Sequence, residues 1–374
     1  MPDVALRFSC DAEPGFRRRR RGNGFSYVDG NGAALRDARE LHRIRTLAIP
    51  PAWRDVWVCR RGDGHLQATG RDARGRKQYR YHPQWQAQRS HTKYAHLREF
   101  GEALPHIRRQ VEAQINGAAT PTRERVLATI VRLLDTTWLR IGNDRYRRDN
   151  GSHGLSTLQR RHAVVEGRQL RLSFRGKSGV RHEAAVDDPR IARIVQRCRE
   201  LPGKELFCHV GSDGQVHGVD SSDVNRWLAE AAAGHPVTAK DFRTWHGSVL
   251  ALQCLLQGCA RVARGAAATE RSAARRIVDE VARQLGNTPA VCRKAYIHPA
   301  VLSLCDTLAD ADECTALLRR PWVRRPLAAH GLKVAERRLL ALLRSGAAEA
   351  VEATPMYPPA PQEAGRHSKC PARR

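Results

Sequence analysis

The sequence predicts an α+β protein, in which a small β-rich N-terminal domain precedes a mainly α-helical domain that contains a small antiparallel sheet. Between Phe25 and Tyr81, short runs of β-branched and aromatic residues alternate with turn signals. After Trp85, apolar residues recur at helical spacing in nearly every segment, except between His162 and Val186, where strand-like alternation returns. A chain of 374 residues is long enough for two domains and a tail.

The β-rich domain is assigned to residues 25–90. Its predicted strands are Phe25–Val28, Val56–Cys59 and His65–Thr69, which are bounded by glycine- and aspartate-containing turns. One helix is expected at about residues 36–47, ending before two prolines. The domain is therefore predicted to consist of strands interrupted by a single helix.

Residues 1–24 are predicted to form a basic, irregular N-terminal arm. The run Arg17–Arg21 stands in a glycine-rich opening, and such a run is either a solvated segment or a set of phosphate contacts. The sequence leaves both possibilities open.

The helical domain is assigned to residues 91–346, and residues 347–374, which are rich in proline, are predicted to be disordered. The clearest helix is expected to start with Thr120 as N-cap and Pro121 in its first turn, and to stop at Gly142. The further predicted helices are Asp188–Glu200, Ser222–Ala233, Thr244–Leu256, Ala267–Leu285, Pro289–Ile297 and Pro299–Leu308.

A three-stranded sheet is predicted inside this helical domain. Residues 163–165, the alternating positions Leu170, Leu172 and Phe174, and a returning strand from Val180 have the period of a half-buried strand. The glycines between the last two strands place Lys177 on the tip of a hairpin.

The formal net charge of +27 indicates a polyanionic partner. Basic side chains gain affinity for nucleic acid by releasing counterions from phosphates, regardless of base sequence. A coding bias would explain why arginine replaces lysine, but it would not explain the size of the positive excess. The charge therefore favours nucleic acid as the partner but does not indicate which reaction the protein catalyses.

Other composition features exclude several classes of protein. The ten cysteines include no CxxC pair and no histidine at zinc-finger spacing, which favours reduced thiols and no structural metal. No apolar run approaches the roughly 20 residues of a membrane span. The N-terminus lacks the apolar core of a signal peptide, so we expect a cytoplasmic protein that associates with the nucleoid.

Four segments contain groups that could break a phosphodiester without a metal ion. This chemistry needs a nucleophile, cationic donors for the non-bridging oxygens and an acid for the departing oxygen. Each segment alone is also consistent with packing, capping or a surface ion pair. The segments are Trp138–Asn143 with Arg140, Phe174–Gly179 with Lys177, Thr238–Gly247 with Arg243, and Leu285–Tyr296 with Asn287 and Tyr296.

The order of these groups, together with the segment Gly64–Tyr81, resembles the type IB DNA topoisomerases of poxviruses and bacteria, which are relatives of the tyrosine recombinases. The resemblance covers about residues 16–312. It implies a tyrosine recombinase/topoisomerase IB catalytic domain that relaxes duplex DNA without cofactor, metal or ATP.

The resemblance also implies a role for each catalytic group. Tyr296 would attack the scissile phosphate to form a 3′-phosphotyrosyl bond, Arg140 and Arg243 would stabilise the transition state, and Lys177 would protonate the leaving 5′ oxygen. Asn287 stands where the poxvirus enzymes have histidine. An amide can donate the same hydrogen bond but cannot change charge.

DNA contacts are implied for seven further residues, and the enzyme is expected to act as a monomer that clamps duplex DNA. Glutamine and arginine can read base edges, whereas lysine mainly positions the duplex. These residues are Arg76, Lys77, Gln78, Tyr79, Tyr81, Tyr146 and Lys240.

Two other functions remain as alternatives. A tyrosine recombinase would share the arginine, lysine and tyrosine chemistry but exchange strands within a tetramer, and the β-rich module with Gly70–Tyr81 argues against it. A non-enzymatic DNA-coating protein would need only the charge, and Tyr296 would then be structural.

Overall fold

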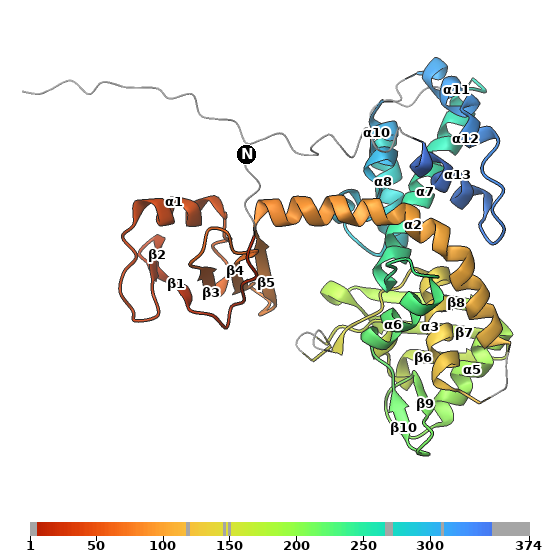
Figure 1. Ribbon diagram of the computed structural model, residues 1–374, viewed down its shortest axis with the longest axis horizontal. Coiled ribbons are helices and arrows are strands. Elements are labelled where there is room, and N and C mark those ends of the chain that lie inside the picture. The colour runs from red at the N-terminus through yellow and green to blue at the C-terminus, as the bar shows by residue number, and fades with distance from the viewer. Residues whose placement is uncertain are drawn as a thin grey trace, which may run out of the picture.

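A long helix, α2 (Pro83–Ile115), joins an N-terminal sheet to a larger, mainly helical part (Figure 1). The computed structural model describes residues 6–116, 120–144, 147–148, 151–265, 272–307 and 310–345. Tyr146 and the tail at residues 347–374 lie outside these ranges. Within them, no helix has the length and apolar character needed to cross a membrane. The predicted α+β class is confirmed.

The N-terminal sheet has five strands in the order β2-β1-β3-β4-β5, and every neighbouring pair is antiparallel. Helix α1 (Ala38–Thr46) starts at Asp37, whose carboxylate accepts from the backbone N–H of Arg39, and its Ile44 packs against the sheet residues Val56, Val58 and Ala68. The strands are β1 (Gly15–Arg21), β2 (Gly24–Val28), β3 (Arg54–Cys59), β4 (Leu66–Arg71) and β5 (Lys77–Tyr81).

The prediction of an irregular arm over residues 1–24 is wrong for its arginine run. Residues 15–21 form β1, an inner strand that pairs with both β2 and β3. Phe16 packs on the α1 side of the sheet, and the Arg18 guanidinium donates to the Pro50 carbonyl oxygen over 3.1 Å. A charged strand is stable here because alternate side chains are held by these contacts. The predicted boundary at residue 90 also falls inside α2.

The helical part packs around one large apolar core, which extends from α2 to the C-terminal helix. Its other helices are α3 (Arg123–Thr137), α5 (Pro189–Glu200), α6 (Ser221–Ala231), α7 (Ala239–Val262), α8 (Ser272–Leu285), α9 (Pro289–Ala295), α10 (Pro299–Thr307), α11 (Ala311–Arg319), α12 (Pro321–Arg324) and α13 (Val334–Arg344). These confirm most predicted helices to within a few residues.

The predicted bounds of two helices are wrong. Helix α3 starts after Thr122, whose hydroxyl caps the Arg125 N–H, rather than after Thr120. It ends at Thr137 instead of Gly142, because Trp138 adopts a left-handed conformation (φ 58°). Helix α7 starts at Ala239 instead of Thr244, since Thr238 and Asp241 form a capping box.

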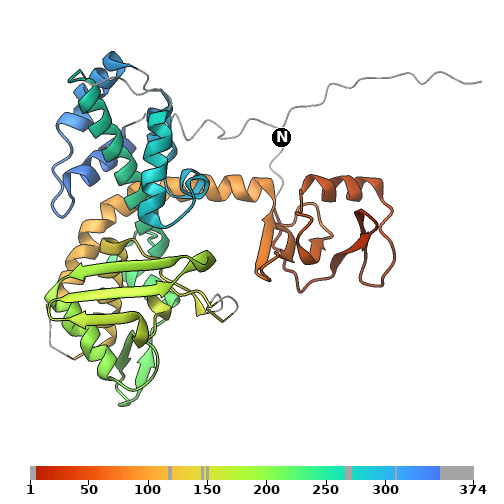
Figure 2. The same cartoon turned by 180° about the vertical axis from the view of Figure 1, so that it is seen from behind.

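The small sheet predicted inside the helical part is confirmed. Strands β6 (Ala163–Glu166), β7 (Gln169–Arg175) and β8 (Arg181–Asp187) form an antiparallel meander, which Figure 2 shows from the side opposite to Figure 1. Lys177 lies in the turn between β7 and β8, as predicted. A short two-stranded sheet, β9 (Cys208–Val210) with β10 (Val216–Gly218), was not predicted.

A buried ion-pair network links four helices beneath the residues that follow α3. Arg108 of α2 donates to Asp135 of α3 over 2.8 Å and to Glu336 of α13 over 2.7 Å. His246 of α7 lies 3.0 Å from Asp135 and stacks on Trp138. Burial alone would raise the pKa of Asp135, but His246 and Arg108 hold it below its usual value. Because Arg108 already bridges the two carboxylates, this cluster is an ion-pair network and not a metal centre.

Candidate active site

Arg140 follows the left-handed turn that ends α3. Its backbone carbonyl accepts from the Leu155 N–H over 2.8 Å, which fixes the segment in place of a continued helix. Its guanidinium Nη2 donates to the side-chain oxygen of Asn287, a residue 147 positions away. This hydrogen bond leaves the amide nitrogen of Asn287 as the group that can donate to a ligand.

Arg243 is the most buried cation of the site, with 3% of its surface exposed. It extends from the second turn of α7, and its Nη1 donates to the Trp138 carbonyl and its Nη2 donates to the Leu285 carbonyl over 2.8 Å. Burial and the neighbouring Arg140 lower the pKa of Arg243 to about 10, so it remains charged at neutral pH. The two carbonyls therefore fix the orientation of this guanidinium.

Tyr296 lies directly after α9, which ends at Ala295, two residues before the predicted end at Ile297. Thr288 caps the helix, Pro289 occupies its first position, and the Tyr296 N–H donates to the Cys292 carbonyl over 2.9 Å. The guanidinium carbon of Arg243 lies 4.9 Å from the centre of the Tyr296 ring. Burial alone would raise the pKa of the Tyr296 hydroxyl, but Arg243, Arg140 and Lys177 lower it below its ordinary value.

Helix α7 also supports the backbone at Tyr296. A side chain at Gly247 would bring its Cβ within 2.5 Å of the Tyr296 carbonyl oxygen. Only glycine permits this approach, because backbone cannot move aside as the end of a side chain can. The same helix therefore positions both the Arg243 guanidinium and the tyrosine.

Lys177 lies on the exposed β7–β8 hairpin. Its positive charge acts on the Tyr296 hydroxyl, but its side chain is more accessible to solvent than those of Arg140 and Arg243. The hairpin therefore contributes a cation that is less rigidly held than the two arginines.

His182 of β8 is a residue of this site that the sequence interpretation missed. A Cβ at Gly176 would lie 2.4 Å from its ring and a Cβ at Gly286 would lie 2.6 Å from it, so the imidazole is wedged between the Lys177 hairpin and the Asn287 turn. Burial, Arg140 and Arg243 lower the pKa of His182 to about 4, which keeps the ring neutral at neutral pH. Its alternation with Ala184 and Val186 is the signal that could have identified an inward position.

Three buried donors of the site are without an oxygen or nitrogen acceptor among the described residues. They are Nη1 of Arg140, Nε of Arg243 and Nδ2 of Asn287. Buried donors normally have acceptors, and here three of them lie on side chains that contact one another or Tyr296. Two of the three carry positive charge, so an anion with several oxygens, such as a phosphate group, is the ligand that fits them.

The predicted DNA-contact residues lie partly in the other lobe. Tyr79 and Tyr81 are each 37% exposed and stack with ring centres 6.1 Å apart. Lys77 is paired with Asp11, and Asp72 accepts from both Arg76 and Gln78. Lys240 is exposed one turn before Arg243 on α7. The β5 residues thus lie in the N-terminal lobe, which α2 joins to the helical part that holds Arg140, Arg243 and Tyr296 (Figure 1).

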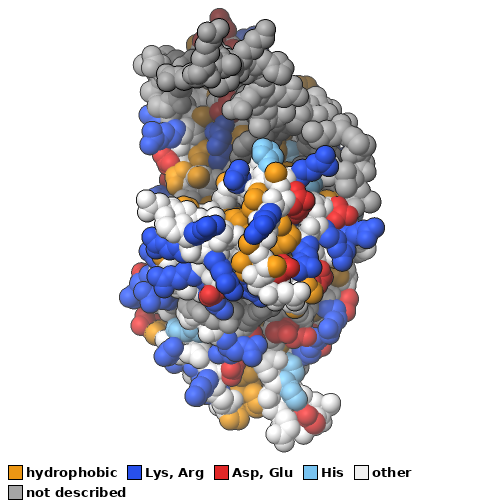
Figure 3. Space-filling model, turned by 90° about the vertical axis from the view of Figure 1, so that its left-hand side faces the viewer, with side chains coloured by type: hydrophobic (Ala, Val, Ile, Leu, Met, Phe, Trp, Pro, Cys, Tyr) orange, Lys and Arg blue, Asp and Glu red, His pale blue; other side chains and the backbone are white. Residues whose placement is uncertain are grey.

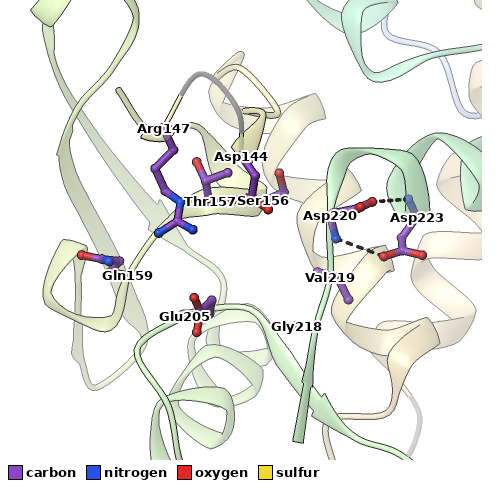
Figure 4. A pocket seen from close by; sticks show the side chains of 10 residues that line it. All are labelled: Asp144, Arg147, Ser156, Thr157, Gln159, Glu205, Gly218, Val219, Asp220 and Asp223. Atoms are coloured by element: carbon purple, nitrogen blue, oxygen red, sulfur yellow. Dashed lines mark hydrogen bonds and ion pairs between the residues drawn. The ribbon is translucent and has the colours of Figure 1, made fainter. Parts of the chain in front are cut away.

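A separate pocket near residues 144–159 is acidic (Figure 4). Its lining includes Asp144, Glu205, Asp220 and Asp223, and the last two exchange backbone hydrogen bonds of 2.9 and 3.0 Å as a helix cap for α6. Asp223 is also paired with an arginine of α3. Because its charge repels phosphate and Asp220 and Asp223 cap α6, this pocket does not compete with the tyrosine cluster as the reactive site.

Comparisons with known proteins match this chain to DNA topoisomerases. The family described as eukaryotic DNA topoisomerase I, catalytic core, matches residues 82–316, and the bacterial DNA topoisomerase IB, N-terminal domain, matches residues 24–72. DNA topoisomerase 1B of Acanthamoeba polyphaga mimivirus is 28% identical over 294 residues, which cover 78% of this chain and 87% of the viral protein. DNA topoisomerase 1 of Mycosarcoma maydis is 26% identical over 175 residues, covering 42% of this chain and 17% of the fungal protein.

The catalytic-core match covers more than half of the chain and includes Arg140, Lys177, Arg243, Asn287 and Tyr296. The chain therefore belongs to the type IB DNA topoisomerases.

Proposed function

We propose that this type IB DNA topoisomerase relaxes supercoiled duplex DNA by transient cleavage of one strand through a 3′-phosphotyrosyl bond to Tyr296, without metal or ATP. The observation that carries the proposal is the cluster of three buried donors, on Arg140, Arg243 and Asn287, around a tyrosine whose pKa is lowered. Such a cluster supplies both charge stabilisation and an activated nucleophile.

Cleavage is a phosphoryl transfer in which one bond forms and one breaks. The Tyr296 oxygen gives up its proton to solvent and attacks the phosphorus, and the bond from phosphorus to the 5′ oxygen breaks. Arg140, Arg243 and Asn287 donate to the non-bridging oxygens while charge accumulates on them. Lys177 gives a proton to the departing 5′ oxygen. Religation is the reverse attack by the 5′ hydroxyl.

An external energy source is unnecessary because one phosphodiester is exchanged for another. While the 3′ end is held covalently, the free 5′ end can turn about the intact strand and release torsion of either sign. We propose that the monomer encloses the duplex between its two lobes, with Gln78, Tyr79 and Tyr81 on one side and Lys240 on the other, and that Tyr146 also contacts the DNA. We propose that it does so on cytoplasmic, nucleoid DNA.

Incubation of supercoiled plasmid with the chain in EDTA and without ATP tests this function directly. The enzyme relaxes the plasmid, whereas a DNA-coating protein only retards its migration. A tyrosine recombinase would instead join strands from two labelled duplexes. Supercoiled plasmid that stays supercoiled at saturating protein would refute the proposal.

Lys177→Ala is expected to slow cleavage of an ordinary strand by about 10²- to 10⁴-fold, the usual contribution of a general acid. With sulfur in place of the 5′-bridging oxygen, the leaving group needs little protonation, and the loss should be much smaller. The measurement is single-turnover cleavage of the two matched duplexes. Equal losses on both would show that Lys177 does not act as the acid.

Gly247→Ala is expected to reduce cleavage because the new methyl group would lie 2.5 Å from the Tyr296 carbonyl oxygen and displace that backbone. A misplacement of the nucleophile by about 1 Å can cost on the order of 10² in rate. Gly258→Ala is the matched control, since it lies on the same helix α7 and a Cβ there has nothing within 4 Å. If both variants cleave at the same rate, close packing at Gly247 is not required for catalysis.

A further inference from the structure

We propose that Arg17, Arg19 and Arg21 of β1 form a phosphate-binding ridge that contacts duplex DNA beyond the tyrosine pair of β5. The inference rests on the proposed function, because it extends the DNA surface that Tyr79 and Tyr81 would begin. The ridge would bind the sugar-phosphate backbone and would not read base sequence. We name these three residues the β1 ridge.

The strand register places the β1 ridge on the same face of the sheet as the tyrosines. Arg17 is opposite Trp57 of β3, Trp57 is opposite Thr69 of β4, and Thr69 is opposite Tyr79 of β5. Directly opposed residues of antiparallel strands point to the same face. Arg19 and Arg21 follow at intervals of two, so they share that face with Arg17.

The opposite face of the sheet is occupied by α1. Val58 and Ala68, which are opposed in β3 and β4, pack there with Ile44. Arg18 points to that side and is held by backbone carbonyls, including that of Pro50. Arg18 is therefore structural, whereas its neighbours in the β1 ridge are on the side of the sheet that α1 leaves open.

Residues 11–13 cross the middle of this open face. Trp57 donates to the Glu13 carbonyl over 3.0 Å, and Thr69 donates to Asp11 over 2.9 Å. Lys77 already pairs with Asp11, so the nearest carboxylate is neutralised. The face thus has two projecting parts, the tyrosines on β5 and the β1 ridge, separated by three strand spacings or about 14 Å.

The three arginines are available for a ligand. All three are exposed, and none takes part in an ion pair found among residues 6–116 or elsewhere in the described chain. Residues at intervals of two along a strand are about 7 Å apart, which lets each guanidinium reach a separate phosphate. Figure 3 views the N-terminal lobe from its end and shows more Lys and Arg than Asp and Glu side chains there.

The position of β1 in the sheet determines which part of the duplex the β1 ridge would contact. Strand β5 adjoins α2, whereas β1 and β2 lie on the far side of the lobe from the catalytic part (Figures 1 and 2). A duplex that touches Tyr79 and continues outward would therefore meet the ridge away from the scissile phosphate. The chemistry of the ridge, three guanidinium groups in a row outside any ion pair of the described residues, suits a duplex backbone.

The test measures how duplex affinity depends on salt, in the full chain carrying Tyr296→Phe so that cleavage does not interfere. Each lost phosphate contact should reduce the slope of log affinity against log salt by about 0.9. We expect a reduction of about 0.9 for Arg19→Gln and about 2.7 for the triple variant Arg17→Gln, Arg19→Gln, Arg21→Gln, with duplexes of unrelated sequence behaving alike.

Arg20→Gln is the matched control, because Arg20 is the next residue on the same strand, is also exposed, and points to the α1 face. It removes the same charge, and its slope should equal that of the parent. An unchanged slope for Arg19→Gln, or an equal change for Arg20→Gln, would overturn the proposal. Failure of the proposed function would show differently, as covalent adduct that still forms in the Tyr296→Phe chain.

Discussion

Tyr296→Phe is expected to abolish plasmid relaxation and covalent adduct formation while leaving duplex affinity nearly unchanged. The substitution removes only the nucleophilic oxygen, and the ring still packs beside the Arg243 guanidinium. The adduct is measured on a denaturing gel with the scissile strand labelled at its 5′ end, since that part stays attached to the protein. Affinity is measured on the same duplex by equilibrium binding.

The control for this substitution is Tyr27→Phe. It removes the same atom from a half-buried tyrosine of β2, in the N-terminal lobe. Adduct formation should persist in that variant. A Tyr296→Phe chain that still relaxes plasmid would mean that another group is the nucleophile, and the mechanism proposed above would be wrong.

Arg243→Lys is expected to lower the rate of cleavage by about 10²- to 10³-fold, the usual cost of removing one preorganised donor to a developing oxyanion. Charge is retained, but the guanidinium fork is lost. In the native site, Nη1 and Nη2 are held by the carbonyls of Trp138 and Leu285, which aims Nε into the cluster. A lysine ammonium cannot bind both carbonyls and still present a fixed donor to the phosphate.

Single-turnover cleavage at saturating enzyme, together with the melting temperature, separates catalysis from stability at this position. Arg125→Lys is the matched control: Arg125 is 4% exposed and donates to the carbonyls of Gln114 and Thr120, away from the site. It should lower the melting temperature and leave the cleavage rate intact. If both variants lose cleavage in proportion to their loss of stability, Arg243 is only a packing residue.

The parts of the fold that could be predicted are those specified by neighbours in the chain. The alternation through Leu170, Leu172 and Phe174 indicates a strand because side chains repeat every two residues. Thr288 and Pro289 indicate a helix start. The Thr288 hydroxyl accepts a hydrogen bond from a backbone N–H of the first turn, and Pro289 has no N–H that would need an acceptor there. The same local reasoning failed for β1. Five successive arginines show no alternation of polarity, although their side chains point alternately to the two faces of the sheet.

The candidate catalytic residues could be named from the sequence through their order and the family resemblance. The residues that hold them in place could not be predicted. His182 depends on Gly176 and Gly286, which come from different segments. The bond from Arg140 to Asn287 spans 147 positions, and the pair of Arg108 and Glu336 spans 228. No local pattern encodes such partners.

The sequence by itself determined the kind of chemistry, because the residue types at Arg140, Lys177, Arg243, Asn287 and Tyr296 decide which charges and nucleophile are present. Only the tertiary structure decided that the two guanidinium groups and the amide are buried together, each with a donor that has no acceptor among the described residues. It also decided that alternate arginines of β1 share a sheet face with Tyr79 and Tyr81. The physical reason is that burial and facing direction arise from packing between distant segments, and these set how strongly a charge acts.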